Sequence, residues 1–523
     1  MFDILIKNGT VIDGTGAPMF RGDVGIRDEK IDKVGDLSNE KGEIEIDATD
    51  KFVCPGFVDV NNHSDTYWRI FLNPDLESLV YQGITTIVGG NCGTSLAPLR
   101  TPETIASIQK WVDLRKVTVN WLSLPEFFKI LEKKPLAVNF ATLIGHATLR
   151  RSFLEDDTRS LTADELTAMD KLLSSSLKKG GLGISTGLIY THAKLASSEE
   201  LVNLAQVAKE NKKVYATHIR GEKDELIRSI EEAISIGEKT KVKLHISHLK
   251  AMGEKNWSLM DEALALIERA KESGQDITFD VYPYTHTGSV LYTLLPDWVS
   301  EGGRKSMLAR LKDLSVRAKA VEEMKESGFD YSKIEIAISP INKTLARKKI
   351  SEIAASQNKS VEEAIIDVLL ASEGQVVASM EVLSQENVDK AVTHPLSIIA
   401  SNGSGYNLEH ASSGERVHPR SFGTFPKVLR DYVVERKLLT WEEAIYKMTW
   451  RPAEKFGIVK RGQIKKDFFA DVLVFDREAI RDLSNKENPY QYSQGIIFSL
   501  VNGRIVLSEG KYLGKKVGEI LKF

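Results

Sequence analysis

The pattern of polar and apolar positions predicts a long α/β middle between two β-rich ends. Near the start, FDILIKNGTVIDGTG and GDVGIRDEKIDKVGDL alternate apolar with polar residues and turn at Gly, Asn and Asp, as short strands do. Near the end, Asp471 to Phe475, Ile497 to Val501 and Gly503 to Leu507 have the same character. We therefore expect one small β domain assembled from both termini, residues 1–52 and 456–523.

The middle of the chain alternates short apolar runs with amphipathic helical patterns. A strand, a helix and a second strand require parallel pairing, because the connection crosses back over the sheet. Capping-box pairs, Thr162 with Glu165 and Thr440 with Glu443, open helices where this scheme needs them. The eight expected strands cover residues 57–59, 85–88, 140–144, 182–185, 214–218, 242–248, 277–281 and 396–400. We expect an α/β fold with a TIM-like (β/α)8 barrel over residues 53–455.

One stretch interrupts this alternation. From Val290 to Thr393 the chain is about twice as long as a single crossover helix needs. We expect an insertion at about 290–345, a candidate lid, because long additions to a barrel lie on its surface and often carry function.

The stretch from Lys213 to Met252 carries a histidine at the end of each of two buried runs. In KVYATHIRGE and KLHISHLKAM, apolar residues lead into His218 and His248, and a helical pattern lies between them. The carboxyl ends of strands in a parallel barrel face one common site, so the two imidazoles can converge. Neutral imidazole is a common zinc ligand, but histidines at strand ends are also found as hydrogen-bonded core residues.

Polar side chains follow the other expected strands as well. They are Asp59, Asn61, His63, Cys92, His146, Tyr190, Arg220, Lys250, Asp280, Tyr282, Tyr284 and Asn402. Groups of this kind at the end of every strand indicate a functional site at the carboxyl end of the barrel.

Composition narrows the class of protein. A hydrophobic share of 42% with a charged share of 27% is typical of a soluble enzyme, and a net charge of -3 gives no electrostatic basis for binding nucleic acid or an anionic membrane. We expect no signal peptide and no membrane span. Two cysteines, Cys54 and Cys92, cannot form a disulfide framework. The pattern favours a cytoplasmic protein acting on a small molecule, with its oligomeric state open.

Motifs along nearly the whole chain carry a family resemblance. In order, they are PGFVDV, GITTIVGGNCGTSLAPL, IGHATLRR, GISTGLIY, THIRGE, ISHLK, DVYPY, HPRSFGTFPKVL and RGQIKKDFFADVLVFD. The chain resembles the N-acyl-D-amino-acid deacylases (D-aminoacylases) of the amidohydrolase superfamily, and the cysteine of NCG is the most specific match. The resemblance implies a metal-bearing (β/α)8 barrel beside a small β-sandwich, and hydrolysis of the amide of an N-acylated D-amino acid.

The resemblance places the ligands of a tight zinc site on Cys92, His218 and His248. A thiolate and two imidazoles suit zinc, and three ligands leave a fourth position for a water whose pKa falls toward ~7. The alternative for Cys92 is a buried structural thiol, which is our interpretation of Cys54 in FVCPGF. We expect one Zn²⁺ per chain.

Two strand ends depart from the family pattern. The family has His-x-His after the first strand and a catalytic aspartate after the eighth, whereas this chain has Asn61-Asn62-His63 and Ser401-Asn402-Gly403. Two of the three ligands for a second metal are therefore neutral amides. We expect a mononuclear site.

Asn402 also replaces the aspartate that, in the family, moves the proton of the attacking water. An amide cannot cycle a proton at neutral pH. Another group has taken the role, or the activated water attacks without it, or the chain no longer hydrolyses anything. The candidate substitutes are His63, Asp65, Glu222 and Asp280. His63 is preferred because its pKa suits proton transfer, although it can equally be a hydrogen-bonding neighbour or a weak ligand.

Substrate contacts carry over from the family in part. Arg420 matches the arginine that pairs with the substrate carboxylate, a task for which a planar guanidinium is suited, although a structural salt bridge is the alternative. Tyr190 and Tyr282 match pocket tyrosines, and Tyr282 is a candidate donor to the developing oxyanion. Ser289 matches a substrate contact more loosely.

Two other functions stay open from the sequence. One is hydrolysis of a different C–N bond, in a cyclic amide or a dipeptide. The other is a catalytically impaired zinc-binding relative, which Asn402 favours, whereas the retained Cys92, His218, His248 and Arg420 favour an enzyme.

Overall fold

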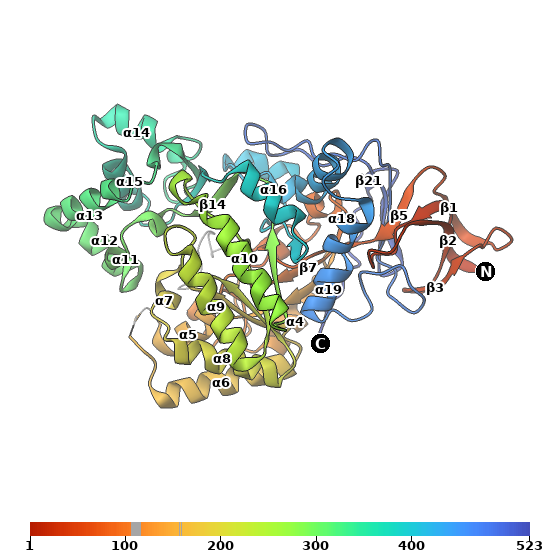
Figure 1. The fold of residues 1–523 in the computed structure, drawn as a ribbon, viewed down its shortest axis with the longest axis horizontal. Coiled ribbons are helices and arrows are strands. Elements are labelled where there is room, and N and C mark those ends of the chain that lie inside the picture. Colours follow the sequence, from red (N-terminus) through yellow and green to blue (C-terminus); the bar gives the residue numbers. More distant parts are fainter. Residues whose placement is uncertain (106–116, 156, 158) are drawn as a thin grey trace.

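The computed structural model describes residues 1–105, 117–155, 157 and 159–523 (Figure 1). Strands from both ends of the chain lie at one end of the molecule, and the helices of residues 297–371 lie at the other. The parallel strands and their helices lie between these two parts. No helix among the described ranges is long and apolar enough to cross a membrane.

One nine-stranded sheet contains strands from both ends of the chain. Its order is β21-β20-β19-β18-β5-β1-β2-β3, with β4 paired to β1. The strands are β1 Phe2–Val11, β2 Phe20–Arg27, β3 Lys30–Gly35, β4 Gly42–Asp47, β5 Phe52–Pro55, β18 Val472–Phe475, β19 Ile496–Val501, β20 Arg504–Ser508 and β21 Lys511–Tyr512. The two ends meet where β5 pairs antiparallel with β18, Cys54 opposite Leu473.

The eight expected strands of the middle are present at the expected places. They are β6 Phe57–Asp59, β7 Ile84–Gly89, β8 Asn139–Thr142 continued by β9 Ile144–Gly145, β10 Gly183–Gly187, β11 Val214–His218, β12 Lys243–Ile246, β13 Ile277–Val281 and β17 Ser397–Ile399. All pairs among them are parallel, in the orders β6-β7-β8 and β9-β10-β11-β12-β13-β17. A parallel bridge between Asn62 and Gly403 joins the segments that follow β6 and β17.

Helices follow these strands. They are α1 Arg69–Leu72, α2 Glu77–Val80, α4 Leu124–Glu132, α5 His146–Leu154, α6 Ala163–Lys178, α7 Thr191–Lys194, α8 Ser198–Glu210, α9 Leu226–Thr240, α10 Leu259–Glu272, α16 Gln385–Thr393, α17 Arg420–Lys427, α18 Trp441–Met448 and α19 Trp450–Phe456. The capping boxes predicted at Thr162 and Thr440 are confirmed: each hydroxyl accepts the backbone N–H of the glutamate three residues on.

The elements added between β13 and β17 form a small unit of their own. Three antiparallel strands, in the order β14-β16-β15, are joined by helices. The elements are β14 His286–Val290, α11 Asp297–Ser300, α12 Gly303–Lys312, α13 Leu314–Glu326, β15 Ile334–Ile338, α14 Ile350–Gln357, α15 Val361–Ala371 and β16 Val377–Glu381. This inserted unit extends beyond the expected stretch 290–345 on both sides, because its first strand, β14, pairs directly with its last, β16, which also pairs with β15.

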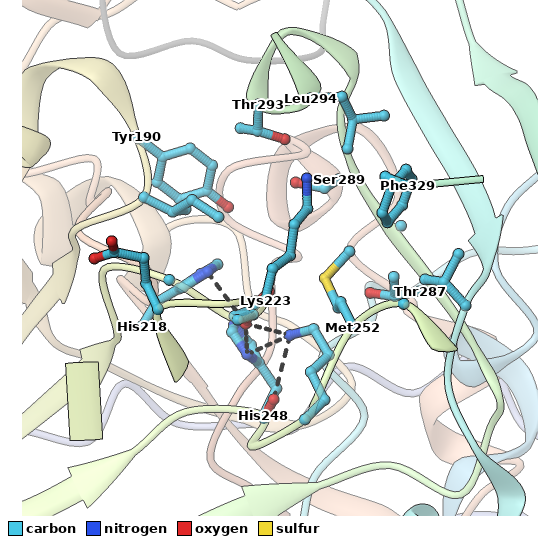
Figure 2. A pocket seen from close by; sticks show the side chains of 18 of the residues that line it. Tyr190, His218, Lys223, His248, Met252, Thr287, Ser289, Thr293, Leu294 and Phe329 are labelled. Carbon is cyan, nitrogen blue, oxygen red and sulfur yellow. Dashed lines mark hydrogen bonds and ion pairs between the residues drawn. The ribbon is translucent and has the colours of Figure 1, made fainter. Parts of the chain in front are cut away.

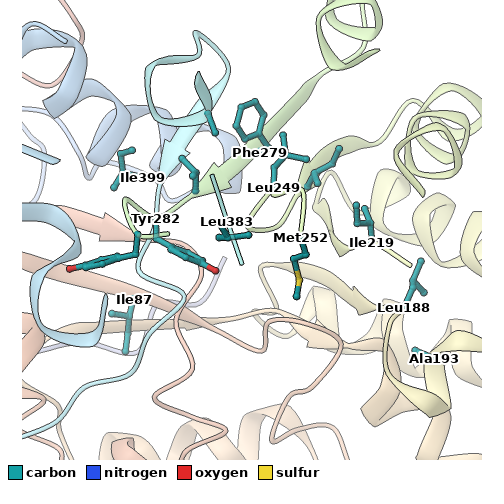
Figure 3. Close-up of a cluster of buried hydrophobic side chains, with 14 of the residues drawn as sticks. Ile87, Leu188, Ala193, Ile219, Leu249, Met252, Phe279, Tyr282, Leu383 and Ile399 are labelled. Atoms are coloured by element: carbon teal, nitrogen blue, oxygen red, sulfur yellow. The ribbon is translucent and has the colours of Figure 1, made fainter. Parts of the chain in front are cut away.

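Apolar side chains from successive strand ends and loops form the core beneath the site (Figure 3). Ile87, Leu249 and Ile399 are buried there, together with Leu383 of the segment after β16. Met252 belongs to this core and also lines the large cavity described below. The floor of the site is therefore close-packed, which restrains the residues that it carries.

A buried ion pair connects the terminal sheet to the parallel strands. Asp471, just before β18, pairs with Arg461 and accepts hydrogen bonds from the Asn139 side chain of β8 and from the backbone N–H of Asn502. Arg461 and Asp471 are 1% and 3% exposed. Removing one partner of such a pair leaves the other charge buried without compensation.

We expect Arg461→Met to lower the free energy of unfolding by about 3–5 kcal/mol, since the Asp471 carboxylate would stay buried and unpaired. Urea unfolding followed by circular dichroism measures the change. Lys33→Met is the matched control, because Lys33 pairs with Glu40 at 3.5 Å on the surface, where a pair contributes less than about 1 kcal/mol. Equal losses in the two variants would contradict a structural role for the buried pair.

Candidate active site

A thiol and two imidazoles meet at the carboxyl ends of three parallel strands, of which β11 and β12 are paired neighbours and β7 belongs to the other group of strands. Cys92 follows β7, His218 ends β11 and His248 follows β12, and one ligand atom of each lies within 4.8 Å of the others. Cys92 Sγ is 3.5 Å from His248 Nε2, and the two imidazole rings are 4.3 Å apart at 86°. All three residues are buried. Among the described residues this is the one such cluster found, and its donors are those that zinc prefers.

The backbone around these groups adopts an uncommon conformation. Cys92, His248 and Asn402 have φ of 51°, 39° and 46°, the left-handed region that non-glycine residues seldom occupy. Each such residue costs roughly 1–3 kcal/mol and persists where the surroundings hold it. Three residues in this conformation around one cavity indicate that the placement of these side chains lowers the stability of the fold.

Buried hydrogen bonds hold the Cys92 loop. Asp65 accepts the N–H of Gly90 at 2.6 Å, and Gly93 N–H donates to Ser185 Oγ at 3.0 Å. At Gly93 a Cβ would lie 2.8 Å from the backbone nitrogen of Gly187, so a larger residue does not fit without a shift. Burial raises the pKa of Asp65 to about 6, against the hydrogen bonds that lower it. Asp65 therefore holds the Cys92 loop in place through its hydrogen bond to Gly90.

Glu222 lies between the two histidines. Its Oε1 is 3.2 Å from His248 Nδ1 and 3.3 Å from His218 Nε2, and it pairs with the Lys250 ammonium. His248 thus presents Nε2 to Cys92, while its Nδ1 faces the Lys250 ammonium at 2.9 Å and the Glu222 carboxylate at 3.2 Å, so these two charged groups orient the ring. Burial, and then the charge of Lys250, lower the pKa of His248 well below its usual value, which favours the neutral ligand form.

The two asparagines that follow β6 and β17, Asn61 and Asn402, have partners of their own. Asn61 Nδ2 donates to both oxygens of Asp280, at 3.2 and 3.3 Å, and Asp280 Oδ2 lies 2.9 Å from His245 Nε2. Asn402 Oδ1 is 2.7 Å from His63 Nε2. Asn61 Oδ1 is buried with no hydrogen-bond partner within the described ranges.

Asp59 fixes the end of β17 relative to β6. Its oxygens accept hydrogen bonds from the backbone and hydroxyl of Ser401 and from Asn62 Nδ2 at 2.9 Å. Burial raises its pKa to about 6. Because Ser401 precedes Asn402 and Asn62 precedes His63, this carboxylate sets the position of both members of the Asn402–His63 pair.

A cavity of about 530 Å³ opens above these groups (Figure 2). It brings together eight of the residues expected from the sequence, His63, Cys92, Tyr190, His218, His248, Ser289, Asn402 and Arg420. Tyr282 is not among its lining residues. The hydroxyl of Tyr282 donates to Thr287 at 2.9 Å, and its ring lies 4.9 Å from the Arg420 guanidinium.

Arg420 begins α17 and is 7% exposed. Its Nε and Nη1 have no hydrogen-bond partner in the part of the chain that the structure describes. Its backbone N–H donates to His418 Nδ1 at 3.0 Å, and His418 Nε2 donates to the His286 carbonyl at 2.9 Å. A buried, always charged guanidinium without an anion is costly, which indicates that an anionic ligand completes it.

Some polar residues at strand ends serve the scaffold instead. His146 Nε2 is 2.7 Å from Glu200, which also accepts from Arg150, and Arg220 pairs with Glu232 at 2.9 Å. The insertion expected as a candidate lid contributes Leu294 and Phe329 to the cavity wall. His418 was not among the residues predicted for the site, although it lies in the HPR motif.

Comparison with known proteins agrees with this geometry. The model of the amidohydrolase family matches residues 52–506. Over 523 residues, 99% of this chain and 97% of the other, the chain is 33% identical to a D-aminoacylase of Alcaligenes xylosoxydans xylosoxydans. It is 32% identical to an N-acyl-D-aspartate deacylase of the same organism, over 99% of this chain and 95% of the relative.

Solved structures lead to the same family. The N-acyl-D-glutamate deacylase of Bordetella bronchiseptica, in complex with zinc and a phosphonate inhibitor, superimposes with a TM-score of 0.84 at 32% identity, with both chains covered completely. The L-hydantoinase of Arthrobacter aurescens, at 17% identity and a TM-score of 0.56 with both chains again covered completely, shares the fold. The chain belongs to the amidohydrolase family and is a homologue of the D-aminoacylases and N-acyl-D-amino-acid deacylases.

Proposed function

We propose that this protein is a zinc-dependent deacylase that hydrolyses the amide of N-acyl-D-amino acids. The observation that carries the proposal is the unpaired guanidinium of Arg420 in the same cavity as Cys92, His218 and His248. A carboxylate clamp beside a metal-ligand cluster suits a small substrate with an amide next to a carboxylate. The D-aminoacylase homology supports the D configuration.

We infer that the eight parallel strands close into a (β/α)8 barrel and that the terminal sheet belongs to a β-sandwich. The continuation of β8 into β9 and the bridge between Asn62 and Gly403 support closure. The division is into residues 1–52 with 456–523 and residues 53–455, the latter carrying the inserted unit. Location in the cytoplasm is part of the same proposal.

Cys92, His218 and His248 would hold one Zn²⁺ per chain. A zinc ion there lowers the pKa of a water and polarises a carbonyl. The donor set of one thiol and two imidazoles fits zinc. A binuclear metal centre is named for a related D-aminoacylase structure, but here Asn61 and Asn402 offer neutral amides, which favours a single ion.

His63 is the residue that we propose to move the proton. Of the other candidates, Asp65 holds the Cys92 loop, Asp280 accepts from Asn61 and His245, and Glu222 is paired with Lys250. If His63 Nε2–H donates to Asn402 Oδ1, the basic atom of the neutral ring is Nδ1. Asn402 thereby selects a tautomer instead of carrying a proton.

The substrate carboxylate would pair with Arg420, and Tyr190 and Ser289 would line the rest of the molecule. Tyr282 packs under the Arg420 guanidinium. Its proposed donation to the oxyanion would exchange the present hydrogen bond to Thr287.

We expect Cys92→Ala to lose bound zinc and hydrolysis together, because only two imidazole ligands would remain. Metal content per chain and release of free amino acid from N-acetyl-D- and N-acetyl-L-amino acids measure both effects. Cys54→Ala is the matched control, since Cys54 is the other buried cysteine but lies in β5. Wild-type release without D selectivity, or release of a ring-opened acid from cyclic amides alone, would replace the proposed reaction.

We expect Glu222→Gln to weaken zinc binding roughly 10- to 100-fold, because the neutral amide would no longer balance the Lys250 ammonium or help to orient the His248 ring. Competition with a chromophoric chelator gives the affinity without reference to turnover. Glu225→Gln, at an exposed position three residues away, is the control. An unchanged zinc affinity in Glu222→Gln would refute the orienting role.

We expect His63→Gln to lower kcat roughly 10²- to 10⁴-fold with little change in KM or zinc content, because proton transfer would be lost while binding persists. Steady-state kinetics of the zinc-loaded variant over a pH series measures the effect. Asn402→Ala should reduce kcat less, since the ring would keep its basic nitrogen and lose only its orienting partner. A larger loss at Asn402 than at His63 would overturn this assignment.

A further inference from the structure

The cavity contains two cations that no carboxylate neutralises. Seven lysine and arginine side chains line it. Five have a carboxylate partner: Lys194 pairs with Asp297, Arg220 with Glu232, Lys250 with Glu222, Lys255 with Asp224 and Lys333 with Asp330. For the other two, Arg420 and Lys223, no ion pair or hydrogen bond from the charged group to a carboxylate exists within the described ranges.

Lys223 follows Glu222 in the loop between β11 and α9 and extends into the cavity (Figure 2). Its half-buried side chain rises between Tyr190 and Phe329, toward Thr293 and Leu294 of the inserted unit. The ammonium lies 4.5 Å from the ring centre of Phe329. Lys223 is thus a charged group with apolar neighbours, at the side of the cavity formed by the inserted unit.

The carboxylates near Lys223 are occupied elsewhere. Burial lowers the pKa of Lys223, and the charges that act against this are those of Asp224, Asp297 and Glu222. Each of these has a closer cation of its own, and Lys194 adds further positive charge beside Lys223. The charge of Lys223 is therefore left for a ligand, as is that of Arg420.

Two unmatched cations in one cavity call for two anionic groups on one ligand. Resting on the proposed deacylase function, we propose that Lys223 forms a subsite for a second carboxylate, so that the preferred substrates are dianionic N-acyl-D-amino acids. Arg420 takes the α-carboxylate. Lys223 takes a carboxylate either on the amino-acid side chain, as in N-acyl-D-glutamate, or at the far end of a dicarboxylic acyl group. Phe329 and Leu294 would contact the methylene groups that carry it.

Matched substrate pairs test this subsite. They also show whether the second carboxylate lies on the amino-acid side chain or on the acyl group. N-acetyl-D-glutamate against N-acetyl-D-glutamine differs only by the side-chain charge, and N-succinyl-D-alanine against N-butanoyl-D-alanine only by a charge on the acyl group. In wild-type enzyme, we expect kcat/KM to favour the charged member of one pair by roughly 10- to 100-fold, mainly through KM, as a charge-assisted hydrogen bond provides. The pair that shows the preference identifies which end of the substrate meets Lys223.

Lys223→Met removes the charge and keeps an unbranched side chain that is one atom shorter. We expect it to lower kcat/KM for the charged substrate roughly 10- to 100-fold and to abolish the preference, while Lys223→Arg retains most of it. Lys209→Met, which removes the same charge at an exposed position on α8, should keep the wild-type preference. An equal loss on charged and neutral substrates in Lys223→Met, or no preference in wild-type enzyme, would overturn the subsite.

Calorimetric binding to the zinc-loaded protein keeps this result separate from the fate of the deacylase proposal. If N-acetyl-D-glutamate binds more tightly than N-acetyl-D-glutamine, and Lys223→Met loses this difference in affinity, Lys223 binds the side-chain carboxylate even if neither compound is hydrolysed. N-succinyl-D-alanine and N-butanoyl-D-alanine test a carboxylate on the acyl group in the same way. Hydrolysis of neutral substrates with equal binding of charged and neutral ligands would support the deacylase and refute the subsite.

Discussion

The burial of Cys92, His218 and His248 at the ends of parallel strands is the constraint on which the rest of the site depends. Three side chains from separate strands can meet only because parallel pairing delivers all strand ends to one side. Their burial then requires a local carboxylate, Glu222, and that carboxylate requires Lys250. The left-handed backbone at Cys92 and His248 is the cost of aiming the side chains inward. The placement of these side chains, the balance of their charges and the backbone strain therefore depend on one another.

Asn61 and Asn402 stand where the family resemblance implies a histidine and an aspartate, and both amides are held by hydrogen bonds in this structure. Each amide has a defined partner, Asp280 for Asn61 and His63 for Asn402. An amide both donates and accepts, so it can order neighbouring groups but contributes no charge to attract a second cation. The chain shares the fold of its relatives, and neither amide adds a negative charge. The proposed proton transfer then depends on a single imidazole.

Much of this arrangement could be predicted from the sequence, and the remainder has identifiable physical reasons. The strand ends that carry Cys92, His218 and His248 follow from apolar runs and turn residues, because backbone periodicity is local. The convergence of the cavity was also predictable, since parallel topology fixes it. By contrast, the pairing of Arg220 with Glu232, and of His146 with Glu200, depends on side-chain reach between helices and could not be separated in advance from a role in the site. The contribution of Phe329 could not be foreseen either, because the inserted unit folds against the cavity through tertiary contacts that leave no periodic pattern.

The pairing of β5 with β18 has a consequence for how the chain is made. The first five strands emerge from the ribosome early, but their sheet lacks its central neighbour until Val472 to Phe475 appear, more than four hundred residues later. At typical elongation rates of about 5–20 residues per second, the open edge of β5 waits on the order of tens of seconds. Throughout that interval an unpaired apolar strand is exposed to other nascent chains. During synthesis the first strands therefore need protection from edge-to-edge pairing with other chains. The pairing of β18 with β5 then covers the open edge.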